Sequence, residues 1–242
     1  MTSRYMPEIA MVFAAGLGTR MRPVTDTMPK PLIKVGGRAL IDHSLDRFAE
    51  AGVKKAIVNV HYLPDMVIEH LLKRAQPEII ISDERDKLLD QGGGICKVLD
   101  QFEGKPFFVC NTDAFWIEGL SNNLQELAAV WDEEIMDILL LVASTPHSIG
   151  VDWPGDFTMD KDGRLIKRAE KEVAPFVYSG IGIIKVDLFS AETREIFGLA
   201  QYFFQAAQRG RLYGKRLDGQ WLHVGRPETI AEAEEAVARS AL

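Results

Sequence analysis

The stretch AAGLGTRMRPVTDTMPKPL, residues Ala14 to Leu32, decides how this chain is interpreted. It follows an apolar run, Ile9–Phe13, of the kind that forms a buried strand in a parallel sheet. Gly16 and Gly18 allow the backbone to approach a ligand closely, and successive N–H groups in such a turn can bind an anion. We therefore expect this segment to bind phosphate groups at the end of the first strand.

Three side chains of the same stretch suit that task. Thr19 offers a hydroxyl, and Arg20 offers a planar guanidinium that matches phosphate oxygens. Lys30 stands between Pro29 and Pro31, whose rings stiffen the backbone that carries it. The stretch is not a Walker A loop, because no Gly-Lys-Ser/Thr follows, and it lacks the third glycine of the dinucleotide fingerprint. An NAD-dependent enzyme is therefore disfavoured.

Strand-like and helix-like segments alternate through the first half of the chain. Such alternation predicts parallel βαβ units, with helices on both faces of the sheet. The expected fold class is therefore α/β, with a Rossmann-like, mostly parallel sheet. The expected strands are residues 9–14, 56–60, 78–82, 106–110 and 136–142, and the expected helices are residues 40–51, 64–74, 92–99 and 120–131.

The second half of the chain is richer in strand-like segments. It predicts a hairpin over residues 156–168 with Asp-Gly at its turn, and a long strand over 176–185 that contains two glycines. A helix over 199–209, a short strand over 221–224 and a terminal helix over 227–241 follow. We expect one domain over residues 1–242, divided near residue 142 into a mostly parallel part and a smaller β-rich part with the C-terminal helix.

Composition limits the classes of function. The chain has 242 residues and a formal charge of −7, which disfavours nucleic-acid binding because phosphate neutralisation needs clustered cations. No segment approaches the roughly 20 apolar residues of a membrane helix, and no signal peptide is evident. Cys96 and Cys110 are expected to be buried thiols. We expect a cytoplasmic protein without a membrane partner, either a monomer or a small homo-oligomer.

The segment from Gly16 to Pro31 resembles the G-x-G-T-R…P-K-P signature of the sugar-1-phosphate nucleotidyltransferases. These enzymes join a nucleoside triphosphate to a sugar 1-phosphate and release pyrophosphate. The resemblance implies two catalytic residues, Arg20 at the leaving pyrophosphate and Lys30 near the α-phosphate. It also implies a set of nucleotide-binding residues, Ala14, Ala15, Gly16, Gly18 and Thr19 at the phosphates, Glu84 at the base edge, and Gly92 and Gly93 beside the base. A helix N-terminal turn is the other interpretation of these last glycines, and the two interpretations are compatible.

The resemblance further implies a metal site. Asp113 ends an apolar strand where the family carries an aspartate that binds Mg²⁺, although an Asp at a strand end can also cap a loop. The later motif is W-x-D-V-G-T in the family, whereas here it is Trp221-Leu222-His223-Val224-Gly225 followed by Arg226. Mg²⁺ prefers oxygen ligands. His223 therefore either binds a softer ion such as Mn²⁺, or contacts phosphate as imidazolium, or marks a weakened metal site.

Four further positions are implied to bind the sugar phosphate. The Glu170-Lys171 pair resembles the family's Glu-Lys pair at the sugar hydroxyl and phosphate, although an exposed charge pair is the simpler alternative. Gly150 and Gly180 match positions where relatives bring backbone against the sugar. On this basis residues 1–142 would be the nucleotide-binding part and residues 143–242 the sugar-binding part.

Among compact members of the family, the chain most resembles the N-acetylmuramic acid 1-phosphate uridylyltransferases of cell-wall sugar recycling. The shared features are the T-x-x-x-P-K-P-L spacing, the GGGI turn, the SGI sequence after Tyr178 and the AEAE terminal helix. Mannose-1-phosphate guanylyltransferases, or other hexose-1-phosphate nucleotidyltransferases, share much of this pattern and remain an alternative. A weakly active regulatory paralogue that binds nucleotide sugars is the other alternative, and His223 motivates it.

Overall fold

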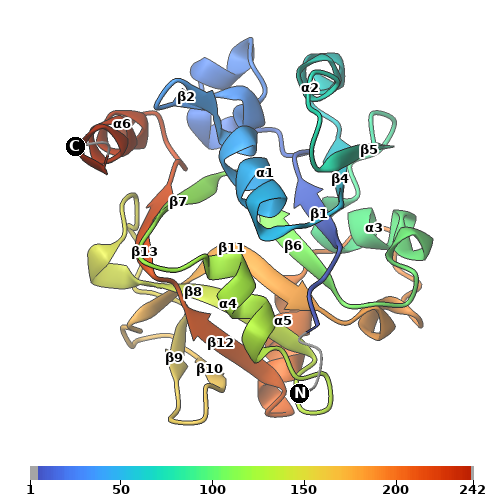
Figure 1. The fold of residues 1–242 in the computed structure, drawn as a ribbon, viewed down its shortest axis with the longest axis vertical. Helices are drawn as coiled ribbons and strands as arrows, with labels where there is room; N and C mark the ends of the chain where they lie inside the picture. The colour runs from blue at the N-terminus through green and yellow to red at the C-terminus, as the bar shows by residue number, and fades with distance from the viewer. Residues whose placement is uncertain (1–4, 241–242) are drawn as a thin grey trace.

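The computed structural model describes residues 5–240, which form one continuous main sheet covered by helices (Figure 1). Four parallel strands lie in the spatial order β6-β1-β4-β5. Strands β4 and β5 therefore lie on one side of β1, and β6 lies on the other. The mostly parallel α/β sheet expected from the sequence is confirmed. These strands are β1 (Ile9–Phe13), β4 (Lys55–Val60), β5 (Glu78–Asp83) and β6 (Phe107–Asn111).

Antiparallel pairing extends the sheet beyond β6. Strand β11 (Phe176–Ile184) runs antiparallel to both β6 and β8 (Ile138–Ser144), and β12 (Leu212–Arg216) runs parallel to β8. The expected hairpin is present as β9 (Phe157–Met159) and β10 (Leu165–Lys167). Nine strands from both halves of the chain therefore share one sheet.

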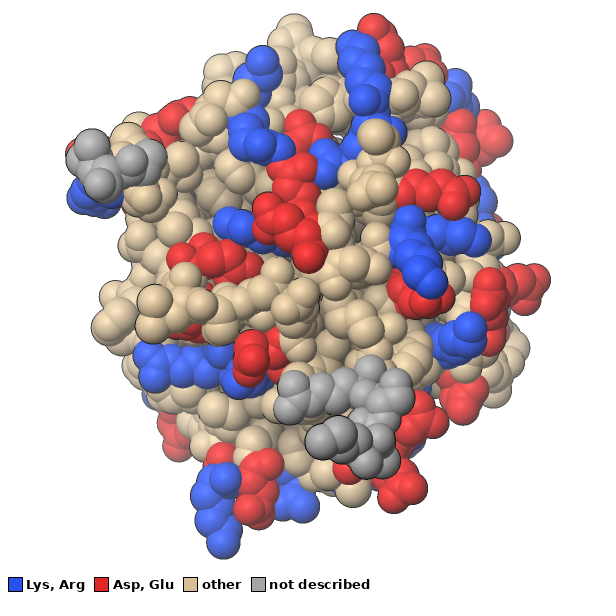
Figure 2. Space-filling model, in the orientation of Figure 1, with Lys and Arg blue, Asp and Glu red and all other residues tan. Residues whose placement is uncertain are grey.

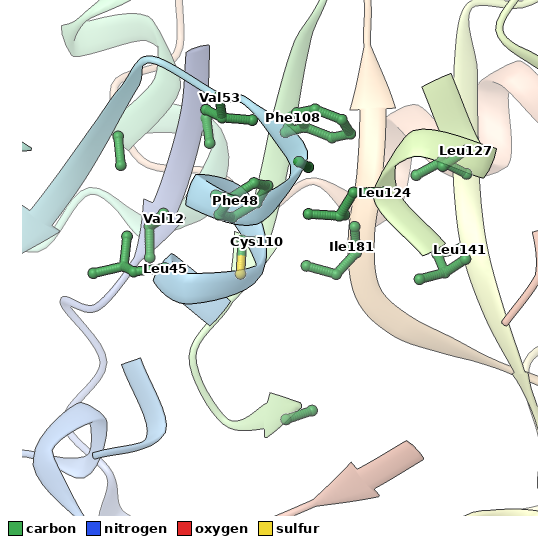
Figure 3. Packing of buried hydrophobic residues seen from close by; sticks show 14 of the residues in the cluster. Val12, Leu45, Phe48, Val53, Phe108, Cys110, Leu124, Leu127, Leu141 and Ile181 are labelled. Atoms are coloured by element: carbon green, nitrogen blue, oxygen red, sulfur yellow. The ribbon is translucent and has the colours of Figure 1, made fainter. Parts of the chain in front are cut away.

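Side chains alternate between two apolar clusters because successive residues of a strand point to opposite faces. Val12 and Phe108 lie on one face, where Figure 3 shows them packed around Phe48. Met11 and Val109 lie on the other face. The first face is covered by α1 (Leu40–Ala51), α2 (Pro64–Leu71) and α4 (Asn123–Val130), and the second by α3 (Asp90–Lys97) and α5 (Ala200–Gln208). The expected helices on both faces are confirmed.

Two small antiparallel sheets complete the fold. Strand β7 (Ala114–Glu118) pairs with β13 (Gly219–His223), and β2 (Lys34–Val35) pairs with β3 (Arg38–Ala39). Helix α6 (Glu228–Ser240) packs against this region through a third apolar cluster. Figure 1 shows α6 beside β2, far along the chain but close in space. The last residue of the expected terminal helix, Ala241, lies outside the described residues.

The structure differs from the sequence-based expectation at several element boundaries. Strands β7 and β12 were not expected, because AFWIE directly follows a polar turn and LYGKR has only two apolar residues. The helix expected over 120–131 begins at Asn123, since the Asn122 side chain accepts a hydrogen bond from the Gln125 N–H and so caps it. The helix expected over 64–74 ends at Leu71.

Truncation of Phe48 should test the packing between α1 and the sheet. Phe48 is fully buried, and its ring lies 5.5 Å from that of Phe108. We expect Phe48→Ala to lower the free energy of unfolding by about 3–5 kcal/mol, because it leaves a cavity in a close-packed core. Urea denaturation measures this, with the exposed Leu72→Ala as the control. An equal, small effect of both substitutions would contradict the packing described.

Candidate active site

The glycine-rich segment and Asp113 meet at the edge of the sheet where the strand order reverses. The chain passes from β1 outward to β4 and β5, then returns to β6 on the other side of β1. Ligands of open α/β sheets bind beside the carboxyl ends of the strands at such a reversal. A pocket of about 520 Å³ opens there. Among the residues predicted from the sequence, it is lined by Ala15, Gly16, Gly18, Thr19, Arg20, Lys30 and Asp113.

The turn after β1 depends on Gly18. Its φ is +64°, and a Cβ there would lie 2.9 Å from the Thr25 methyl group, so a side chain would be both strained and crowded. The Thr25 hydroxyl donates to the Gly18 carbonyl at 2.8 Å and fixes the turn. Gly16 differs, because no protein atom lies within 4 Å of the place where its Cβ would be. The missing side chain at Gly16 therefore leaves room on the pocket side.

A buried polar chain supports the start of this turn. The Ala14 N–H donates to Asn59 Oδ1 at 2.9 Å, and Asn59 Nδ2 donates to Glu84 Oε1 at 2.9 Å. Glu84 Oε2 accepts from the Leu89 N–H at 3.2 Å. Burial raises the pKa of Glu84, which is only 2% exposed. Both carboxylate oxygens are occupied and Glu84 does not line the pocket, so the expected direct contact with a base edge does not fit this geometry.

The glycines at the start of α3 are also explained by packing within the protein. A Cβ on Gly92 would lie 2.1 Å from the Phe197 ring, and a Cβ on Gly93 would lie 2.1 Å from the Glu195 carbonyl oxygen. The Gly92 N–H donates to the Phe197 carbonyl at 2.8 Å. The structure therefore confirms the helix N-terminal turn, and the place of these glycines beside a base remains a prediction. Gln91, just before these glycines, does line the pocket.

Lys30, Asp113 and His223 form a charged cluster, of which Lys30 and Asp113 line this pocket while His223 lines two neighbouring hollows. Lys30 Nζ lies 3.1 Å from Asp113 Oδ2, and His223 Nε2 lies 3.6 Å from the same oxygen. Burial tends to raise the pKa of Asp113, but hydrogen bonding from His223 and the charge of Lys30 outweigh it and hold this pKa well below its usual range. Burial lowers the pKa of Lys30, while Asp113 opposes that shift. Asp113 is therefore a carboxylate.

Backbone contacts fix His223 beside Asp113. The isolated bridge between Ile149 and Leu222 brings Gly150 against β13, and His223 Nδ1 lies 3.2 Å from the Gly150 carbonyl oxygen. The imidazole stacks on the Trp221 ring, with the ring centroids 5.7 Å apart and an angle of 3° between the ring planes. Gly150 has φ +75°, and a Cβ there would lie 2.1 Å from the His223 carbonyl oxygen. Gly150 is thus required by its contact with β13, whether or not a sugar also approaches it.

Arg20 connects the pocket to the second half of the molecule. It lies in the short 3₁₀ turn Thr19–Met21 and lines the pocket beside the glycine-rich turn together with two further hollows. One hollow contains Gly180 and His223, and the other contains Gly150 and His223. The structure therefore places Gly150 and Gly180 next to the charged cluster.

Glu170 and Lys171 are not brought into these pockets. Both are exposed and lie in a turn after β10. That turn wraps around Arg168, whose Nη1 donates to the carbonyls of Ala169, Glu170 and Glu172. In this conformation the two side chains match the simpler interpretation of an exposed charge pair, and their predicted contacts with a sugar phosphate remain a prediction.

Asn59, Gln91 and Asn111 are site residues that sequence reasoning missed. Asn59 and Asn111 both stand near the carboxyl ends of apolar strands, and Gln91 Nε2 donates to Asn111 Oδ1 at 2.7 Å. A buried polar residue in a run such as Ala-Ile-Val-Asn-Val is a signal that could have identified Asn59. No comparable signal separates Gln91 from an ordinary helix start.

The charge distribution agrees with a local rather than an extended anion site. On the face shown in Figure 2, Lys and Arg are interspersed with Asp and Glu.

No helix within residues 5–240 combines the length and the apolar character that crossing a membrane requires.

Comparison with known proteins identifies the family. The nucleotidyl transferase family model matches residues 9–240. An N-acetylmuramate alpha-1-phosphate uridylyltransferase of Caulobacter vibrioides is 43% identical over 97% of this chain and 98% of its own. A mannose-1-phosphate guanyltransferase of Yarrowia lipolytica is 30% identical over 90% of this chain and 61% of its own. The inositol-1-phosphate CTP transferase from T. maritima shares the fold, with a TM-score of 0.76 at 18% identity over 98% of each chain. The resemblance of the segment from Gly16 to Pro31 is thereby confirmed, and the chain belongs to the nucleotidyl transferase family.

Proposed function

We propose that this protein transfers a uridylyl group from UTP to N-acetylmuramic acid 1-phosphate, giving UDP-N-acetylmuramic acid and pyrophosphate in the recycling of cell-wall sugars. The observation that carries the chemistry is the Lys30–Asp113 ion pair, which lines one pocket together with the glycine-rich turn and has His223 beside Asp113. The choice of base and sugar is supported by the 43% identical relative from Caulobacter vibrioides.

The reaction needs positioning and charge neutralisation more than acid–base chemistry. An oxygen of the sugar phosphate attacks the α-phosphorus of UTP, and the bond from that phosphorus to the bridging oxygen of the β-phosphate breaks. The nucleophile is already an anion and needs no base. Lys30, at the pocket wall, would stabilise the charge that develops on the α-phosphate, and Arg20 would bind the departing pyrophosphate.

Asp113 and His223 are the residues that would hold a divalent ion. The donor set fits such an ion in part. Asp113 supplies a carboxylate oxygen, but no group of three or more His, Cys, Asp or Glu side chains gathers anywhere in residues 5–240. Phosphate oxygens and water would have to complete the coordination, as is common for Mg²⁺. When bound, the ion would neutralise phosphate charge.

The two contacts of His223 support a cation at this position. Both ring nitrogens face oxygens, Nδ1 the Gly150 carbonyl and Nε2 the Asp113 carboxylate. A neutral imidazole carries a single N–H, so one lone pair would face an oxygen. A divalent ion held by His223 and Asp113 would remove this conflict. Nitrogen donation favours Mn²⁺ over Mg²⁺.

A panel of substrates tests the proposed reaction. Pyrophosphate release is measured with UTP, GTP, CTP and dTTP, each paired with N-acetylmuramic acid, N-acetylglucosamine and mannose 1-phosphates. We expect turnover to be fastest with UTP and N-acetylmuramic acid 1-phosphate. Turnover only with GTP and mannose 1-phosphate would replace the proposed substrates, and nucleotide binding without turnover in any pair would favour the regulatory alternative.

Removal of either charge from the central ion pair should impair chemistry. We expect Lys30→Ala and Asp113→Ala each to reduce kcat by about 100-fold or more, the scale seen for groups that stabilise charge in a transition state. Lys34→Ala removes an exposed lysine of β2 and serves as the control. Thermal melting of each variant checks its folding. Near-normal kcat in a folded Lys30→Ala variant would remove Lys30 from its assigned role.

Restoring a carboxylate at residue 223 should change the preference for metal. We expect His223→Asp to shift selectivity from Mn²⁺ toward Mg²⁺ by about 10-fold or more, because Mg²⁺ is bound best by oxygen. Calorimetric titration of both ions into the protein with a non-hydrolysable UTP analogue gives the affinities directly. An unchanged ratio of the two affinities would argue against His223 as a ligand.

Glu84 should act as a positioning residue and not as a reader of the base. Glutamine cannot accept both hydrogen bonds that Glu84 accepts, so Asn59 and the Ala14 N–H lose support. We expect Glu84→Gln to raise KM about equally for UTP and CTP and to lower the free energy of unfolding by about 1–3 kcal/mol. The surface substitution Glu78→Gln is the control. A selective loss of UTP over CTP would instead indicate direct contact with the base.

A further inference from the structure

A second pocket of about 380 Å³ lies beside the one lined by the glycine-rich turn. The two pockets share Gln91 and Asn111, which stand between them. A molecule joined at the charged cluster could therefore extend past Asn111 into the second pocket. The walls of this second pocket come from β9, β10, β11 and α5.

Aromatic rings form much of its wall. Tyr178 and Phe203 meet edge to face, with ring centroids 5.2 Å apart, and Phe157 and Phe204 also line the pocket. The Tyr178 hydroxyl is buried and has no hydrogen-bond partner among the described residues. Such a wall suits the apolar face of a sugar ring or an acyl group.

Two cations stand at this pocket, each held by the protein. Lys167 Nζ lies 3.8 Å from the centroid of the Phe204 ring. The Arg168 guanidinium donates four hydrogen bonds to backbone carbonyls from Nε and Nη1, which leaves Nη2 uncommitted among residues 5–240. The arrangement favours an anion with planar oxygens near Lys167 and Arg168.

The only carboxylate lining the pocket, among the described residues, is already committed. Asp156 Oδ1 accepts from Trp153 Nε1 at 3.1 Å, and Oδ2 accepts from the Tyr178 N–H at 2.8 Å. Burial raises the pKa of Asp156, although hydrogen bonds from the Tyr178 N–H and Trp153 and the charge of Arg168 oppose that shift. Because its two oxygens accept from Trp153 and Tyr178, Asp156 forms no salt bridge with Lys167 or Arg168, and both cations remain available to a ligand.

We infer that this pocket binds an acidic substituent of the acceptor sugar, with its carboxylate between Lys167 and Arg168 and its apolar part on the Tyr178 and Phe203 rings. The inference rests on the proposed function. N-acetylmuramic acid carries a lactyl carboxylate that N-acetylglucosamine lacks, and both share the ring, the acetyl group and the phosphate. The two cations are then specificity-determining residues that separate these sugars.

Lys167→Gln tests the inference, because Lys167 is exposed and its replacement leaves the backbone contacts of Arg168 in place. KM is measured for N-acetylmuramic acid 1-phosphate and N-acetylglucosamine 1-phosphate at saturating UTP. We expect KM for the first sugar to rise by about 10-fold, as for loss of one charge-assisted hydrogen bond, and KM for the second to change by less than about 2-fold. Lys167→Arg should restore the wild-type ratio of the two KM values.

Lys161→Gln is the matched control, since Lys161 lies exposed at the hairpin turn and lines none of the pockets described. It should leave both KM values unchanged. Equal effects of Lys167→Gln on the two sugars would overturn the inference, because they would place Lys167 at a group that both sugars share. A wild-type protein that does not discriminate between the two sugars would overturn it as well.

Direct binding separates failure of this inference from failure of the proposed reaction. If the wild type turns over neither sugar, the proposed function fails, and calorimetry with UDP-N-acetylmuramic acid and UDP-N-acetylglucosamine still tests the pocket. Tighter binding of the acidic nucleotide sugar that is lost in Lys167→Gln supports the inference. Equal affinities for the two nucleotide sugars overturn it.

Discussion

The ion pair between Lys30 and Asp113 is the contact on which the candidate site depends. The two residues are separated by 83 positions in sequence, and each stands in a segment that follows a strand of the central sheet. A mostly buried ammonium is costly unless a carboxylate faces it. The reversal of strand order around β1 brings the two segments to one edge, so the fold provides the partner that a buried Lys30 requires. The Thr112 hydroxyl, which donates to the Phe13 carbonyl at 2.8 Å, ties the ends of β1 and β6 together beneath that pair.

Much of the parallel half could be predicted because local patterns there agree with the fold. Apolar runs bounded by turns indicated β1, β4, β5 and β6. Helical periodicity indicated α1 with the same first and last residues that the structure shows. Strands β7 and β12 could not be predicted in this way. Their stability comes from pairing with β13 and β8, which are distant in sequence, and not from a periodic pattern of their own.

The site residues likewise fall into those that a sequence motif identifies correctly and those whose role depends on tertiary contacts. Gly18, Arg20, Lys30 and Asp113 lie in or beside recognisable motifs, and the structure gathers them at one pocket. Glu84 and Gly92 also lie in recognisable segments, yet their environments are set by tertiary contacts that no motif reveals. Glu84 is held by Asn59 and Leu89, and Gly92 is packed on Phe197. A motif thus indicates which residues are near a site, whereas burial and hydrogen bonding determine which of them can reach a ligand.

Asn111 lines three adjoining pockets and accepts a hydrogen bond from Gln91. Its amide is therefore a common boundary of the spaces assigned to the donor and the acceptor. A ligand on one side that moved this amide would change the space on the other side, and by thermodynamic linkage the change in affinity would be equal in both directions. If two substrates occupied these spaces and shifted this amide, the affinity for each would depend on whether the other is bound.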